Sequence, residues 1–184
     1  MTFEQDFSQE LLSLIFNNES LGLYQYEGSG GPITGSASAG NVYIGLYGTD
    51  IIHDSKPTIE AGLERLTQDV TKVDINGLSY GVVEATYDGY HRVAIPRSSA
   101  EWSIIGSQVS NINEIVFPTV NIQLPSAIID TPGQEIFYWA IGTESTGPGK
   151  ILYWGTLTGS PVSFVPVQGM IPRIAAGTLV IVEG

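Results

Sequence analysis

Residues 135–142 read Glu-Ile-Phe-Tyr-Trp-Ala-Ile-Gly, and residues 151–158 read Ile-Leu-Tyr-Trp-Gly-Thr-Leu-Thr. Both runs are rich in β-branched and aromatic residues and are apolar on both faces that a strand would present. Such strands are typical of central positions in a sheet or of sheets covered by another layer. The turn signal Gly147-Pro148-Gly149 lies between them, so we expect two strands joined by a hairpin loop.

Short strand patterns recur through the sequence from Tyr80 onward. Turn signals such as Asp88-Gly89 and Pro132-Gly133 separate them at intervals of about 8–12 residues, a spacing typical of β-sandwiches. No internal repeat is visible. The pattern predicts an all-β fold, a single antiparallel β-sandwich of jelly-roll-like form with an N-terminal α-helix and long loops. The expected strands are 80–86, 90–95, 101–105, 112–117, 120–124, 135–142, 151–158, 162–167 and 177–182.

Residues 2–16 predict the N-terminal helix. Thr2 and Gln5 fit a capping box, and Asn17-Asn18 follows as a stop signal. An apolar stripe at helical spacing contains Phe3, Phe7, Leu11, Leu14 and Ile15. This stripe needs cover, which either the same domain or a neighbouring subunit would supply.

The rest of the N-terminal part has weaker patterns. Residues 28–40 are rich in Gly, Ser and Ala, which indicates a long loop or flexible arm because such a segment buries little apolar surface. Residues 42–47 predict a strand, and residues 58–70 have the spacing of a short helix. We therefore expect residues 1–79 to form a helix, a flexible loop and an irregular excursion, and residues 80–184 to form the β-sandwich core.

The composition fits one folded domain over residues 1–184. A formal net charge of −12 disfavours nucleic acid as a partner, because phosphate binding needs clustered Lys and Arg. Seven acidic residues precede Lys56, the first basic residue, so the N-terminal half is either a solvated acidic face or a surface that docks on a basic partner. No apolar run approaches the roughly 18 residues of a membrane helix, so we expect no membrane association.

Residues that could carry chemistry are few. The chain has no cysteine, and its two histidines, His53 and His91, lack partners at metal-binding or catalytic spacing. We therefore expect no metal, no cofactor and no catalytic site. A carbohydrate-active enzyme is the enzymatic alternative, and it would need two carboxylates roughly 5–10 Å apart in a cleft.

Two loops resemble ligand-binding motifs but fail on spacing. In the phosphate-loop look-alike that ends at Lys150, Glu144 stands where the motif needs its first glycine, and Ile151 follows in place of Ser or Thr. Residues 142–150 therefore predict a hairpin loop. In Asp74-Ile-Asn-Gly77 the glycine comes too early for a calcium loop, so a turn is expected.

Several short motifs occur in an order that resembles a group of small tailed-bacteriophage virion proteins. The motifs are Tyr90-His-Arg-Val-Ala-Ile95, Trp102, Ile115-Val-Phe-Pro118, Leu152-Tyr-Trp-Gly-Thr-Leu157 and Ala176-Gly-Thr-Leu-Val-Ile181. The proteins of this group are described as head decoration, minor tail or tail-fibre proteins. The resemblance covers residues 3–16, 42–48 and 80–184, and it implies a β-sandwich with a structural role in the virion.

This resemblance and the sparse chemistry lead to an expected function. We expect a capsid decoration, or cement, protein on the virion surface that contacts the major capsid protein and forms a homo-oligomer such as a trimer. The alternative is a tail, fibre or baseplate component that binds host glycans. The candidate interface residues are Phe3, Phe7 and Leu11 in the helix, Gly30, Gly31, Pro32 and Ile33 in the glycine-rich loop, and Ile59 and Leu63 in the 51–79 excursion.

Overall fold

The fold is taken from a computed structural model. It describes residues 3–19, 39–51, 74–75, 78–121, 134–146, 150–158 and 163–183. The expected short helix at 58–70 and almost all of the expected loop at 28–40 lie outside the described residues, as does His53.

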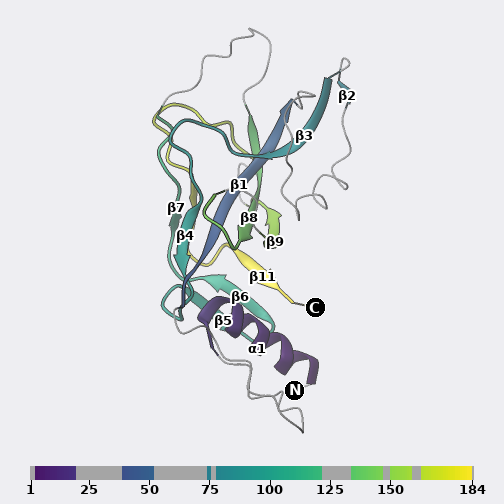
Figure 1. The fold of residues 1–184 in the computed structure, drawn as a ribbon, viewed down its shortest axis with the longest axis vertical. Helices are drawn as coiled ribbons and strands as arrows, with labels where there is room; N and C mark the ends of the chain where they lie inside the picture. Colours follow the sequence, from purple (N-terminus) through teal and green to yellow (C-terminus); the bar gives the residue numbers. More distant parts are fainter. Residues whose placement is uncertain are drawn as a thin grey trace. The chain divides into compact units, whose positions relative to one another are not determined.

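The described chain is mostly β, with one short helix (Figure 1). The helix is α1 (Phe3–Asn17), which confirms the helix expected at 2–16. The strands are β1 (Asn41–Ile51), β2 (Asp74–Ile75), β3 (Leu78–Glu84), β4 (Val93–Pro96), β5 (Trp102–Ile105), β6 (Gln108–Asn111), β7 (Ile115–Val116), β8 (Glu135–Gly142), β9 (Ile151–Thr156), β10 (Arg173–Ile174) and β11 (Val180–Val182).

Three sheets contain these strands. The largest has the order β2-β3-β1-β8-β9, with β4 also paired to β1. The second consists of β10 and β7, and the third has the order β11-β6-β5. Neighbouring strands with a resolved register run antiparallel. The prediction of a β-rich fold with antiparallel sheets and an N-terminal helix is therefore confirmed.

The contacts within the chain divide it into two compact units. The first unit contains Met1–Val42, Ile95–Ile115 and Arg173–Gly184, and the second contains Tyr43–Ala94 and Val116–Pro172. The first unit therefore holds α1 and the three-stranded sheet, whereas the second holds most of the large sheet. That all 184 residues form one domain stays a prediction.

In the first unit, α1 packs on β5 and β6. Leu12 and Phe16 are fully buried, and the Phe16 ring lies 4.7 Å from the Trp102 ring. Residues 12 and 16 are one turn apart and lie on a different side of the helix from Phe7 and Leu11. The apolar stripe expected from the spacing is therefore not the face that packs on the sheet.

The end of α1 is defined by backbone geometry and by Arg97. Asn18 has a φ of 57°, the left-handed conformation that ends many helices, so the expected stop at Asn17-Asn18 is confirmed. The guanidinium of Arg97 donates hydrogen bonds to the carbonyl oxygens of Leu14 and Ile15, at 2.6 Å from Nε to Ile15. A cation at this position satisfies two free carbonyls and complements the helix dipole.

The β5–β6 hairpin corrects one expected strand. Gly106 has a φ of +60°, which a tight hairpin turn requires at this position, and Ile105 pairs with Gln108. The strand is therefore Gln108–Asn111, followed by β7, and not a single strand over 112–117. The buried side chain of Asn111 explains the break, because its Oδ1 accepts from Leu179 N and its Nδ2 donates to the Ala175 carbonyl.

Other expected strands are shorter or shifted. The strand expected at 90–95 begins only at Val93, and that at 177–182 begins at Val180. Within 162–167 the described residues make an isolated bridge, between Phe164 and Ile136. Val120 and Asn121 are not in a strand, and the rest of 120–124 lies outside the described residues.

In the second unit, β1 and β8 form the middle of the large sheet. Their buried side chains include Ile44, Leu46 and Ile141. A bulge interrupts their pairing beside Gly48, where a Cβ would lie 2.1 Å from the carbonyl oxygen of Glu135. The two strands therefore approach each other at a point that only glycine allows.

Candidate contact surface

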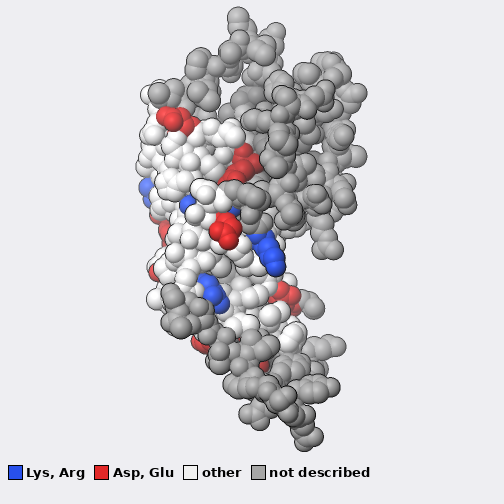
Figure 2. Space-filling view, in the orientation of Figure 1, with Lys and Arg blue, Asp and Glu red and all other residues white. Residues whose placement is uncertain are grey.

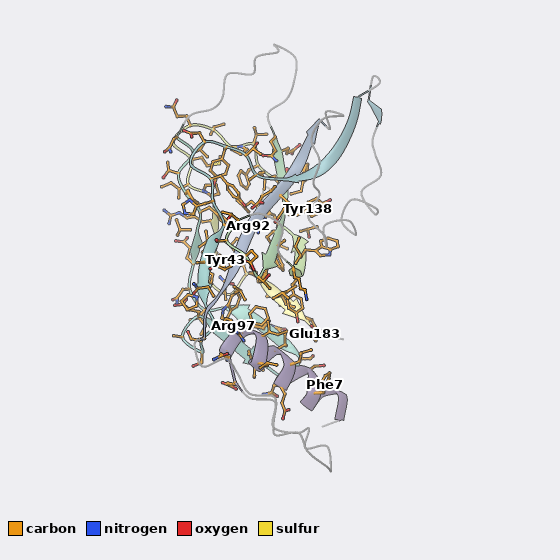
Figure 3. The ribbon with its side chains drawn as sticks, in the orientation of Figure 1. Phe7, Tyr43, Arg92, Arg97, Tyr138 and Glu183 are labelled. Atoms are coloured by element: carbon orange, nitrogen blue, oxygen red, sulfur yellow. The ribbon has the colours of Figure 1, made fainter. Side chains whose placement is uncertain are left out.

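The expected interface residues on the helix are accessible in part. Phe7 is 38% exposed and lies towards the N-terminal end of α1 (Figure 3). Leu11 is half-buried, and Phe3 begins the helix with a side chain outside the described part. The remaining candidates, Gly30, Gly31, Pro32, Ile33, Ile59 and Leu63, also lie outside the described residues.

The three-stranded sheet has one face that packs against α1 and an opposite face that α1 does not cover. Along each strand successive side chains point to opposite faces. Ile104, Val109 and Ile181 share one register row on the inner side, where Val109 is fully buried. The opposite side chains form the open face, which consists of Ser103, Ile105, Gln108, Ser110, Val180 and Val182.

The open face combines exposed aliphatic side chains with uncharged polar ones. Ile105 is 77% exposed, Val182 is 65% exposed and Val180 is 40% exposed. None of the six residues is charged, although the chain carries a formal net charge of −12. Depletion of charge around apolar residues is typical of protein contact surfaces.

Sequence reasoning did not identify this surface. Ile105 and Val182 lie in or at the end of expected strands, but alternation alone does not say which side of a strand faces the core. The strand between them, β6, had no apolar pattern beyond Val109. A signal was present in Ile104-Ile105, because two adjacent isoleucines in a strand point to opposite faces.

A second exposed strip lies on β9 in the second unit. Trp154 is 42% exposed, and its neighbour two residues earlier, Leu152, is also exposed. The Tyr138 ring meets the Trp154 ring edge-on, with centroids 6.2 Å apart. The aromatic pair therefore joins β9, the last strand of the large sheet, to its neighbour β8, and both rings lie in strands and not at a loop tip.

A polar cluster surrounds the buried Arg92 in the second unit, and Figure 3 labels this arginine. Its Nε and Nη2 donate to the two oxygens of Glu84, at 2.7 and 2.8 Å, and its Nη1 donates to the Glu144 carbonyl. The Tyr90 hydroxyl also donates to Glu84, at 2.9 Å, and accepts from Leu46 N. The hydrogen-bonding groups are thus satisfied by one another, which is typical of a structural network.

Two tyrosines near this cluster, Tyr87 and Tyr90, have raised pKa values. Burial, followed by the negative charge of Glu84, raises the pKa of Tyr90 well above its usual range. Burial also raises the pKa of Tyr87 to about 12, and its hydroxyl donates to the Pro118 carbonyl at 3.1 Å. Both phenols are therefore neutral hydrogen-bond donors at neutral pH.

The loops that resembled ligand-binding motifs connect strands. Gly142 and Lys150 lie at the ends of the antiparallel strands β8 and β9, and Thr143 N donates to the Lys150 carbonyl. The hairpin prediction for 142–150 is confirmed. Ile75 pairs with Leu78 between β2 and β3, as the predicted turn at 74–77 requires. His91 is exposed and precedes β4.

The described residues contain neither a metal-binding cluster nor a membrane-spanning helix. No group of three or more His, Cys, Asp or Glu side chains lies close enough to hold a metal ion within the described ranges. In that same part of the chain, no helix has the length and apolar character to cross a membrane. In the view of Figure 2, the described surface is largely uncharged, with acidic and basic side chains scattered over it.

No protein-family model and no curated protein matches the sequence.

Proposed function

We propose that this chain is a bacteriophage virion structural protein that acts as a capsid decoration, or cement, protein. It would stabilise the head through protein–protein contacts, with the major capsid protein as its partner on the capsid surface. The finer form of the fold in this proposal is a jelly-roll-like β-sandwich. Placement in a virion is supported by the sequence resemblance alone.

The main support for a role in protein–protein contacts is the open face of the three-stranded sheet. Ile105 and Val182 are largely exposed and share one register row. Exposed aliphatic side chains of this kind are typical of surfaces that another molecule covers. A cement protein stabilises a shell by burying exposed surface, including surface between neighbouring copies of the cement protein itself.

The number and position of copies in purified virions test this proposal. We expect copies in numbers comparable to the major capsid protein, spread over the head, when protein bands are quantified and the virions are imaged. Virions that lack the chain should release their DNA at a lower temperature than complete virions. A few copies confined to the tail would contradict the proposal.

The alternative is a tail, fibre or baseplate component that binds host glycans. It is favoured by the exposed Trp154, whose ring meets that of the partly buried Tyr138, because sugar rings stack on exposed tryptophan faces. Binding on a glycan array that Trp154→Ala abolishes, while the fold is retained, would support this alternative. An array without any binding would remove it.

A further inference from the structure

The first row of side chains on the open face has the same kind of residue at both ends, and this arrangement suits contact with a second copy of the face. The first register row reads Ile105, Gln108 and Val182 across β5, β6 and β11. The row therefore has an aliphatic side chain on each outer strand and a polar amide on the middle strand. The second row reads Ser103, Ser110 and Val180.

We propose that the open face packs against the open face of a second copy of this chain, around a two-fold axis parallel to β6. Such an axis lies between the two stacked sheets and exchanges the outer strands. It places β5 over the partner's β11 and β6 over the partner's β6. Two packed sheets lie about 10 Å apart, the distance at which facing side chains meet.

In the first row this arrangement matches side chains of the same character, and in the second row it places Ser103 opposite Val180 of the partner subunit. Ile105 meets Val182 of the partner subunit, and the reverse contact repeats by symmetry, so both aliphatic ends of the first row are covered. Gln108 meets the partner subunit's Gln108, and two amide groups both donate and accept hydrogen bonds. An axis across the strands, midway between the two rows, would instead place Ile105 over the partner subunit's Ser103 and so leave this isoleucine without an aliphatic partner.

Charge also favours this face for contact between two copies. Each copy carries a formal net charge of −12, so two copies repel each other at long range. The six residues of the open face carry no charge, so pairing there brings no like charges into direct opposition between these side chains. Added salt should strengthen the pairing, because it screens the general repulsion without weakening the apolar contact.

The size of the face limits the affinity. A standard interface has about 20–30 residues on each side, and the open face has six. We therefore expect reversible dimers with a dissociation constant between micromolar and millimolar. In a virion, the proposed arrangement would be reinforced by high local concentration.

Sedimentation of the purified full chain over micromolar to millimolar concentrations tests the inference. We expect a reversible monomer–dimer equilibrium that Ile105→Glu with Val182→Glu weakens by about tenfold or more, because each glutamate then faces another. Ile105→Lys with Val182→Glu should restore pairing, because each lysine faces a partner's glutamate. Circular dichroism should show that both variants fold, since both positions are highly exposed.

The matched control is Val167→Glu with Ile171→Glu, which makes the same charge change at exposed positions of the second unit. This control should leave the dimer intact. A chain that stays monomeric at all concentrations, or an oligomer that survives the two glutamates on the open face, would overturn the inference. Failure of the lysine–glutamate variant to restore pairing would overturn the two-fold axis. None of these outcomes depends on where the chain lies in a virion.

Discussion

Two arginines of the first unit carry the same charge but have different roles, because their surroundings differ. Arg97 donates to the carbonyls of Leu14, Ile15 and Ala39, which come from two segments of the chain. Arg173 forms an ion pair with Glu114 at 2.8 Å, and both side chains are substantially exposed. The sequence does not distinguish them, since the carbonyl groups that Arg97 binds have no side-chain signature.

Replacing Arg97 should loosen the docked helix. Arg97→Ala removes the donors for three carbonyls, so we expect a loss of about 2–3 kcal/mol in the free energy of unfolding and a lower helical signal. Arg97→Lys should recover only part of this, because an ammonium group does not have the planar fork of a guanidinium. Urea unfolding followed by circular dichroism measures both.

The control for this prediction is Arg173→Ala. An exposed ion pair contributes about 0–1 kcal/mol, so this variant should unfold close to the wild type. Equal losses for the two arginines would mean that Arg97 does not hold the end of α1.

Tyr87 should resist ionisation. Burial raises its pKa from 10.0 to about 12, so the folded state binds the phenolic proton more tightly than the unfolded state does. The resulting stability is present below pH 10 and is lost as the pH rises towards 12. The difference in tyrosinate absorbance between wild type and Tyr87→Phe should therefore rise near pH 12. A rise near pH 10 would show that Tyr87 is exposed.

At the scale of elements, the sequence predicted the helix and the strands that have a strong hydrophobic pattern. The helix at 2–16 and the strands at 135–142 and 151–158 have clear periodicity or continuous apolar runs, and the structure has them within two residues at each end. β6 was missed because it contains mainly polar residues, and β10 was missed because it has only two residues, so both strands are recognised only through their pairing partners.

The candidate contact surface was predictable only in part for a related reason. Periodicity identified Phe7 and Leu11 as apolar helix residues, yet Leu12 and Phe16 form the packed side. The helix is apolar on more than one side, so the choice depends on which side best covers Trp102. To identify the open face, one needs the register of three strands, and no local sequence pattern gives this register.

The close approach of β1 and β8 at Gly48 gives a prediction for these elements. In Gly48→Ala the new Cβ would meet backbone atoms of Glu135 and Ile136, which a side-chain rotation does not relieve. We expect a loss of about 3 kcal/mol in the free energy of unfolding. The control is Gly106→Ala, where the space is open and only the positive φ is strained, at a cost of about 1 kcal/mol. Chemical denaturation compares them, and a smaller loss at Gly48 than at Gly106 would contradict the close approach.

At the scale of the whole molecule, the chain passes between the two units repeatedly. The first unit uses three separate segments, and the second unit uses the two segments between them. Neither unit is therefore a continuous stretch of sequence. α1, the β5–β6 hairpin and β11 come from segments that are far apart along the chain but form one unit.

Truncation after Pro172 should therefore damage an element that lies far away in the sequence. This change removes β11 and two partners of the Asn111 side chain, so the inner side of the three-stranded sheet loses Leu179 and Ile181. We expect the Trp102 fluorescence to shift towards that of an exposed indole and the chain to aggregate. A truncated chain with an unchanged Trp102 spectrum would contradict this. Trp139→Phe with Trp154→Phe isolates the signal of Trp102.

The pairing of β11 with β6 also determines when the three-stranded sheet is completed during synthesis. α1 is made before this sheet, and the sheet gains β11 only after residues 180–182 are made. At the usual rate of elongation, this delay is on the order of ten seconds. Once β6 has been made, the nascent chain presents Phe16, Trp102 and Val109 without β11, so chaperone binding should be greatest just before residues 180–182 emerge.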